Sequence, residues 1–205
     1  MRQKTKFAIY NLIKHFFPAY SSRIRQTILR WCGVRIGKNV LISACAEFWG
    51  EGCIEIGDNC LISDHCYLAA DGHVIVGKNT QIYQHTILSA NGSSTLSIGE
   101  NCQIAHMVSL KTSTHEISPP PDSEDDVAGG ACIAGTSKFE DIVIGAGCWL
   151  CAGAIVIPGV KLGHRCIVAA GAVVTRDTPA NVLVAGVPAV VKKLYGVKEV
   201  VEELC

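Results

Sequence analysis

The first 46 residues contain no Asp or Glu, although nine of the chain's 18 Lys and Arg residues fall there. This region also lacks an apolar run long enough for a membrane-spanning helix or a signal peptide, because Asn11, Lys14 and His15 interrupt it. Helical hydrophobic spacing is absent from most of the remaining chain, where apolar residues recur every six positions. These absences argue against an exported protein, a membrane-spanning protein and a helical domain.

The acid-free N-terminus is instead expected to form short helices, because of how its apolar and basic residues are arranged. Lys6–Arg35 alternates apolar and basic residues, and Pro18 must divide it into two helices. Two interpretations remain open and are compatible. The helices cap the end of the following domain with their basic residues solvated outside, or they also make weak contact with an anionic membrane.

An internal repeat dominates the rest of the sequence. An aliphatic residue followed by Gly opens six segments, which begin at residues 36, 56, 76, 98, 144 and 162. A period near 20 residues is typical of a solenoid. Within each segment the period of six fits one short strand plus one tight corner, so three units make a triangular coil. Asn39, Asn59, Asn79 and Asn101 occupy a corner position where the backbone needs positive φ, which Asn tolerates.

The 11 cysteines do not form a disulfide framework. Five of them occupy the small inward position of a hexad, where Ala, Thr or Val also occurs: Cys60, Cys66, Cys102, Cys148 and Cys166. They behave as small buried apolar residues. Their odd total and the lack of an export signal favour a reducing cytosol. The Cys148–Cys151 pair matches a redox motif, but a strand position favours a structural role.

The candidate chemistry lies in the histidines and in one long break. His65 and His85 hold the same place in successive coils and are expected to stack on an outer edge. The period fails for 33 residues after Leu110, in a segment with three consecutive prolines and four acids within 122–126. His115 stands at the root of this break. A His on a rigid scaffold beneath a loop is a plausible general base.

These motifs resemble the hexapeptide-repeat acyltransferases. The likeness covers roughly residues 34–193 and is closest to the branch of galactoside, maltose and bacterial surface polysaccharide O-acetyltransferases. It rests on IGENCQIAHMVSLKTSTHEIS, on IVIGAGCWLCAGAIVIPGVKLGHRCIVAAGAVVTRDTPANVLVAGVPAVVKK and on the repeated I-G-x-N hexads. The resemblance implies a left-handed parallel β-helix and a homotrimer with its active sites between subunits.

The resemblance also implies roles for particular residues. His115 matches the catalytic histidine. The acetyl-CoA contacts fall on Trp149, Ala152, Ala170, Thr175, Arg176, Lys192 and Lys193. Tyr83 and His85 replace two asparagines near the family's sugar site, so the acceptor pocket differs from that of galactoside or maltose enzymes. His115 would take the proton from an acceptor hydroxyl, and the Ala152 N–H would hold the oxyanion.

We therefore predict an all-β solenoid with three parts. Residues 1–34 form a basic helical cap, and residues 35–185 form the β-helix with an excursion at about 111–143. Residues 186–205 form a helical tail. The predicted function is an acetyl-CoA-dependent O-acetyltransferase for a sugar hydroxyl in surface polysaccharide or glycoconjugate biosynthesis. We expect a cytoplasmic protein, in possible peripheral contact with the inner membrane face, with no metal and no nucleic-acid partner.

Three other functions stay open. A serine or other small-molecule acetyltransferase shares the fold, but it usually has a longer helical N-terminal domain. A non-catalytic scaffold would not need His115, Trp149 and the basic tail together. A zinc enzyme of the β-helical carbonic anhydrase kind would need three histidines from adjacent coils, and Met107 takes the third place here.

Overall fold

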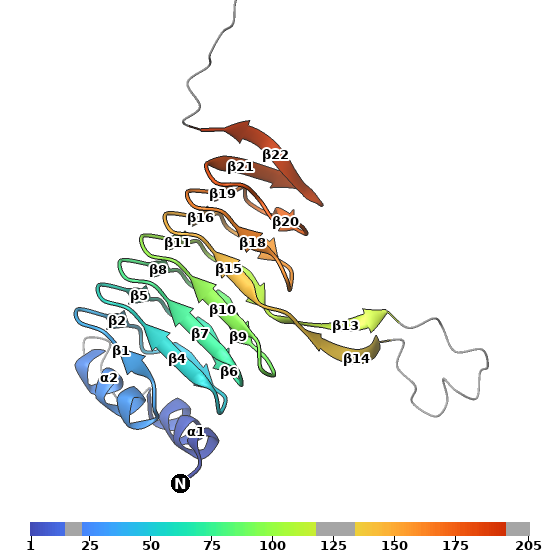
Figure 1. Cartoon of the computed structure of the whole chain (residues 1–205). Helices are drawn as coiled ribbons and strands as arrows, with labels where there is room; N and C mark the ends of the chain where they lie inside the picture. Colours follow the sequence, from blue (N-terminus) through green and yellow to red (C-terminus); the bar gives the residue numbers. More distant parts are fainter. Residues whose placement is uncertain (15–21, 118–133, 196–205) are drawn as a thin grey trace, which may run out of the picture.

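The chain forms a three-sided parallel β-solenoid that is closed at one end by two helices. The computed structural model describes residues 1–14, 22–117 and 134–195. Helices α1 (Gln3–Ile13) and α2 (Ser22–Trp31) lie against the first coil, and the coils then stack to the C-terminal end (Figure 1). Two short helices were predicted and are present, whereas Pro18, the predicted breaker, lies outside the described residues.

The coils contribute strands to three sheets, in which every pairing is parallel except that of β22 with β21. The first sheet contains β1 (Arg35–Ile36), β4 (Cys53–Ile56), β7 (His73–Val76), β10 (Thr95–Ile98), β15 (Ile142–Ile144) and β18 (Lys161–Leu162). The second contains β2 (Leu41–Ile42), β5 (Leu61–Ile62), β8 (Gln81–Ile82), β11 (Gln103–Ile104), β16 (Trp149–Leu150), β19 (Ile167–Val168), β21 (Val182–Gly186) and β22 (Ala189–Leu194). The third contains β3 (Glu47–Trp49), β6 (Tyr67–Ala70), β9 (Ile87–Ala90), β12 (Ser109–Lys111), β17 (Ile155–Val156) and β20 (Val173–Val174).

The hexad residues fill the interior in register, as predicted. In the second sheet, Ile42, Ile62 and Ile82 are aligned Cα partners and all are buried. Each inward side chain therefore packs on the same position of the coils above and below, which makes the core a set of continuous apolar columns. The described inward cysteines, such as Cys66 and Cys102, are also buried and free.

The corner between the first and second sheets carries an asparagine ladder. Asn39, Asn59, Asn79 and Asn101 have φ values of 53°, 57°, 57° and 58°, which confirms the predicted left-handed conformation. Each side-chain amide donates to the carbonyl oxygen of the next Asn, over 3.2, 3.0 and 3.0 Å. The ladder ties successive coils together along this edge.

Two basic side chains of the N-terminal cap are buried, which corrects the expectation that all of them are solvated. The Arg25 side chain is buried and donates from Nε to the Ile42 carbonyl over 2.9 Å. Lys14 is also buried, and its Nζ donates to the Ala46 carbonyl over 3.3 Å. The first coil has no preceding coil to supply backbone donors, so side chains of the cap satisfy its carbonyls.

The C-terminal end is a strand hairpin where a helical tail was predicted. Strand β22 pairs antiparallel with β21 and extends the second sheet. The helical prediction is wrong for residues 189–194, because the open edge of the solenoid offers β21 as a template for a further strand. Residues 196–205 lie outside the described part of the chain.

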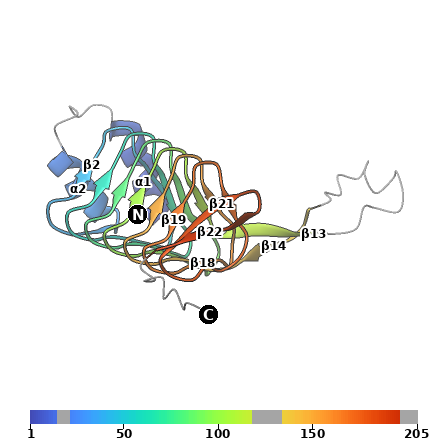
Figure 2. The ribbon, with the colours of Figure 1, turned by 90° about the horizontal axis from the view of Figure 1, so that it is seen from above.

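The long break leaves the solenoid as an antiparallel hairpin. Strands β13 (Ser113–Ile117) and β14 (Ala134–Phe139) pair with each other and project away from the coils (Figures 1 and 2). The Ser113 hydroxyl donates to Asn91 Oδ1 over 3.1 Å. The Phe139 ring lies so close to Gly92 that a Cβ there would approach it to 2.8 Å. Both contacts fix the root of the hairpin to the preceding coil.

Candidate functional site

His115 lies on the projecting hairpin, outside the coils. It is exposed and stands opposite Ser137 of β14. The register shifts between His115 and Ile117, so the regular pairing ends just after His115. The sequence therefore placed His115 correctly at the root of the break but did not indicate a paired strand there.

Tyr83 and His85 lie at the corner between the second and third sheets. The Tyr83 ring stacks on His106 with centroids 5.5 Å apart, and its hydroxyl donates to Gln81 Oε1 over 2.7 Å. His85 stacks on His65 at 5.0 Å with an interplanar angle of 2°, which confirms the predicted histidine stack. Among the described residues, no three His, Cys, Asp or Glu side chains are grouped to hold a metal ion.

A single chain does not bring His115 to Tyr83 and His85. These two residues precede strand β9 of the third sheet, whereas His115 follows strand β12 of the same sheet. Tyr83 and His85 therefore lie beyond one end of the strands of the third sheet, and His115 lies beyond the other end.

Trp149 lies in a register column on the outer face of the second sheet, between Gln103 and Ile167. Trp149 is the Cα partner of Ile167, Ile167 of Leu183, and Leu183 of Lys193. Trp149 is 48% exposed and lines a cavity of about 450 Å³ together with Arg165. The Lys193 ammonium lies 5.2 Å from the ring centre of Tyr195, which lines the same cavity. An aromatic side chain and cations thus share one face.

Ala152 and Ala170 occupy equivalent positions in adjacent coils at the corner between the second and third sheets. The Gly171 N–H donates to the Ala152 carbonyl over 2.9 Å, and the Gly153 N–H donates to the His106 carbonyl over 2.9 Å. The two alanines therefore continue the corner that carries His106, next to Tyr83. The structure brings the predicted cofactor alanines and the predicted acceptor residues to one edge.

Thr175 and Arg176 lie apart from this edge, just after β20 of the third sheet. They line a cavity of about 290 Å³ together with Ala189 and Val191 of β22. Lys192 and Lys193 belong to the same strand. Strand β22 thus joins the predicted basic residues to the Thr175–Arg176 pair.

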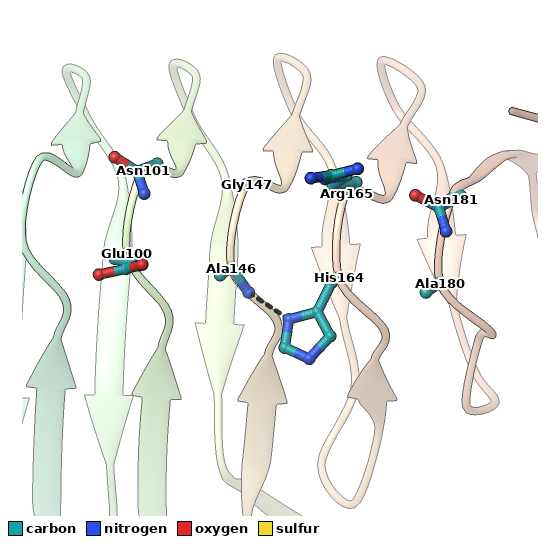
Figure 3. A pocket seen from close by; sticks show the side chains of 8 residues that line it. All are labelled: Glu100, Asn101, Ala146, Gly147, His164, Arg165, Ala180 and Asn181. Atoms are coloured by element: carbon teal, nitrogen blue, oxygen red, sulfur yellow. Dashed lines mark hydrogen bonds between the residues drawn. The ribbon is translucent and has the colours of Figure 1, made fainter. Parts of the chain in front are cut away.

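The sequence analysis missed a second cavity, of about 620 Å³, beside Trp149. Figure 3 shows its lining, in which Asn101, Arg165 and Asn181 project from corners in one row, with Gly147 between Asn101 and Arg165. The His164 Nδ1 accepts a hydrogen bond from the Ala146 N–H over 3.1 Å, which fixes the ring. Arg165 and Asn181 share the positive φ of the Asn column, so that column could have located them.

The Cys148–Cys151 pair flanks a strand of the coils and does not lie at a strand-to-helix turn. Cys148 is buried in the core, and Cys151 follows strand β16. Burial raises the pKa of the Cys151 thiol, and hydrogen bonds with Cys102 and Cys166 raise that of Cys148. Thiols with raised pKa values are poor nucleophiles, which agrees with the structural role predicted from the sequence.

Part of the sequence matches known acetyltransferases. Residues 141–176 match the family described as bacterial transferase hexapeptide (six repeats). This segment lies within the C-terminal half of the solenoid. The chain is 32% identical over 96 residues to a galactoside O-acetyltransferase of Lactococcus lactis, a stretch that covers 47% of this chain and 42% of that protein. It is 38% identical over 88 residues to a Staphylococcus aureus 2,3,4,5-tetrahydropyridine-2,6-dicarboxylate N-acetyltransferase, covering 38% of this chain and 34% of that protein.

Two solved acyltransferase structures share the fold. The AntD N-acyltransferase of Bacillus cereus, solved with dTDP and coenzyme A, superposes with a TM-score of 0.70 at 24% identity over 82% of this chain and 88% of that one. A galactoside acetyltransferase in complex with coenzyme A superposes with a TM-score of 0.60 at 20% identity. The match covers 94% of this chain and 80% of that one. The chain spans only 42% and 34% of the length of the two curated relatives.

Proposed function

We propose that this protein is an acetyl-CoA-dependent O-acetyltransferase that acts on a sugar hydroxyl. The observation that carries the proposal is the register column from Trp149 to Lys193. Three strand spacings of about 4.8 Å separate its ends by roughly 14 Å. This suits an extended thioester arm beside the indole, with phosphates beside the ammonium. The sequence relative named as a galactoside O-acetyltransferase agrees with this chemistry.

His115 acts as the general base in this proposal. An acceptor hydroxyl is a weak nucleophile, so the imidazole takes its proton as the oxygen attacks the thioester carbonyl. The Ala152 N–H stabilises the oxyanion. The tetrahedral intermediate then collapses, the acetyl ester forms and the coenzyme A thiolate leaves, with the proton returned to it from the imidazolium. Both substrates meet in one cleft, so no covalent enzyme intermediate is needed.

The active site forms between two copies of the chain in a homotrimer. The hairpin of one copy brings His115, and the corner of the next copy brings Ala152 and Ala170. Tyr83 and His85 lie on that same corner and contact the acceptor. The arrangement is supported by the separation of His115 from this corner, since the two lie beyond opposite ends of the third sheet's strands within one chain.

Arg165 joins the proposed cofactor set of Trp149, Thr175, Arg176, Lys192 and Lys193. Its side chain lines the cavities on both sides of the corner beside Trp149. A guanidinium there is placed to pair with a phosphate. The acceptor belongs to surface polysaccharide or glycoconjugate biosynthesis in this proposal.

The test is an acceptor screen with acetyl-CoA, in which release of the coenzyme A thiol is measured. The screen contains free sugars, nucleotide sugars and lipid-linked glycans. We expect thiol release with at least one hydroxyl acceptor and an ester-linked acetyl group in the product. No thiol release with any acceptor would contradict the proposal.

Amine acetylation is the second candidate, because one relative is named as an N-acetyltransferase. Amino sugars in the same screen separate the two. An amide product with amino sugars, and no ester with their hydroxyl counterparts, would favour the second candidate.

A further inference from the structure

A separate cavity lies on the outer face of the third sheet, near its N-terminal end. It measures about 280 Å³ and is lined by residues of three successive coils, including Trp49, Tyr67, Asp71 and Asn91. Lys4 of helix α1 borders it. None of these residues belongs to the catalytic or cofactor set described above. The cavity is therefore distinct from the proposed catalytic and cofactor sites.

Its lining combines two aromatic side chains with a carboxylate and an amide. The Trp49 indole N–H donates to Glu47 Oε2 over 3.4 Å, which holds the ring in place. Tyr67 is 37% exposed. Burial, with the Glu47 and Asp71 carboxylates, raises the pKa of its phenol, so the hydroxyl keeps its proton and remains a donor. The cavity offers flat apolar surface beside hydrogen-bonding groups.

This combination matches a sugar ring. A pyranose has an apolar face of C–H groups, which stacks on an aromatic ring, and a rim of hydroxyls, which donate to carboxylate oxygens and accept from amide N–H groups. The Asp71 carboxylate disfavours a phosphate or another anion, and the Lys4 ammonium that borders the cavity is paired with Glu51 Oε2 at 3.7 Å. A purely apolar ligand would remove water from the Asp71 carboxylate without replacing its hydrogen bonds.

Asn91 connects the cavity to the hairpin that carries His115. Its Oδ1 accepts hydrogen bonds from the Ser89 hydroxyl over 2.9 Å and from the Ser113 hydroxyl over 3.1 Å. Ser113 and His115 are two residues apart on β13 and therefore lie on the same face of the strand. Because Ser113 reaches Asn91, that face is turned toward the coils that form the cavity. His115 lies about 7 Å further along the strand.

We propose that this cavity is a carbohydrate subsite, which binds a pyranose ring of the acceptor next to the unit whose hydroxyl His115 activates. The inference rests on the proposed function, and it adds a binding surface from the same copy as the base. Trp49 and Tyr67 cover the ring, and Asp71 and Asn91 bind its hydroxyls. The subsite would make the protein prefer an oligosaccharide over a single sugar.

The experiment measures sugar binding without acetyl-CoA and then acetyl transfer. The probes are methyl glycosides of galactose, glucose, mannose and N-acetylglucosamine, with their disaccharides, in saturation-transfer NMR. The variants are Trp49→Ala and Asp71→Asn. Ile75→Ala, at an exposed position on the first sheet, is the matched control. We expect at least one glycoside to bind, with affinity about tenfold weaker in both variants and unchanged in the control.

The transfer assay separates the subsite from the proposed function. In both variants the acceptor KM rises while the acetyl-CoA KM stays constant. Glycoside binding that depends on Trp49, without transfer to any acceptor, would support the subsite and contradict the proposed function. Transfer with normal acceptor KM in both variants, or no glycoside binding by the wild-type protein, would overturn the subsite. Altered oligomeric state in Trp49→Ala with glycoside binding intact would assign the cavity to a contact between copies and also overturn it.

Discussion

Trp149 and Lys193 lie in one register column of the second sheet, joined through Ile167 and Leu183. Strand β22 creates this relationship by pairing antiparallel with β21. A helical tail would have left Lys193 without a fixed place relative to the indole. The hairpin at the end of the solenoid thus orders the basic residues along the proposed cofactor path.

The first prediction concerns these basic residues. The triple variant Arg176→Gln, Lys192→Gln and Lys193→Gln should raise the acetyl-CoA KM at least tenfold, because phosphate partners are lost. All three side chains are exposed, so the fold should be unchanged. Steady-state kinetics and a thermal melt measure both effects. An unchanged acetyl-CoA KM in the folded variant would remove these residues from the site.

The second prediction concerns stability of the cap. Arg25→Met should lower the free energy of unfolding by about 1.5–3 kcal/mol, because it leaves the buried Ile42 carbonyl without its charged donor. Arg23→Met, at an exposed position of the same helix, should change it by less than about 0.5 kcal/mol. Urea denaturation compares the two. Equal losses of unfolding free energy in the two variants would mean that the buried hydrogen bond contributes little to stability.

The third prediction concerns the segment between β13 and β14. Replacing residues 118–133 with a short Gly/Ser linker should keep the melting temperature within a few degrees. The β13–β14 pairing and the Phe139–Gly92 contact remain in this variant. Acceptor KM should rise, because we predict that Ser118–Glu140 is a lid or an acceptor-side wall. Unfolding of the variant would show that the segment is part of the packing.

The fourth prediction concerns membrane contact. No helix in the described ranges is long and apolar enough to cross a membrane. Helix α2 nevertheless exposes Ile24 and Trp31 beside Arg23. If the cap binds anionic lipid, Arg2→Gln with Arg23→Gln should weaken sedimentation with phosphatidylserine vesicles, and added salt should do the same. Vesicle binding that is unaffected by the double substitution and by added salt would exclude an electrostatic contact.

The repeat made much of the fold predictable. The hexad spacing identified inward residues such as Ile62, and the Asn column identified a corner with positive φ. Both are local properties that each coil repeats, so sequence spacing alone encodes them. The inward use of Arg25 and Lys14 was not predictable, because it depends on which carbonyls the first coil leaves unpaired.

The candidate site was less predictable than the fold. His115 stood out because the period fails beside it, yet the strand pairing of the hairpin depends on residues more than 20 positions later in the chain. The Trp49 cavity is assembled from three coils and a helix, and no single motif marks it. Sequence spacing predicts the features that every coil repeats, whereas the hairpin and the cavity depend on contacts between segments far apart in the sequence.

The central claim is that His115 is the general base, and turnover of His115→Ala tests it most directly. His115 is exposed on the hairpin, so the variant should fold normally and bind acetyl-CoA normally. His73→Ala, at an exposed position on the first sheet, is the control and should keep full activity. With the best acceptor from the screen, the account predicts a kcat about 10²–10⁴-fold lower for His115→Ala. A kcat near that of the wild-type protein would contradict it.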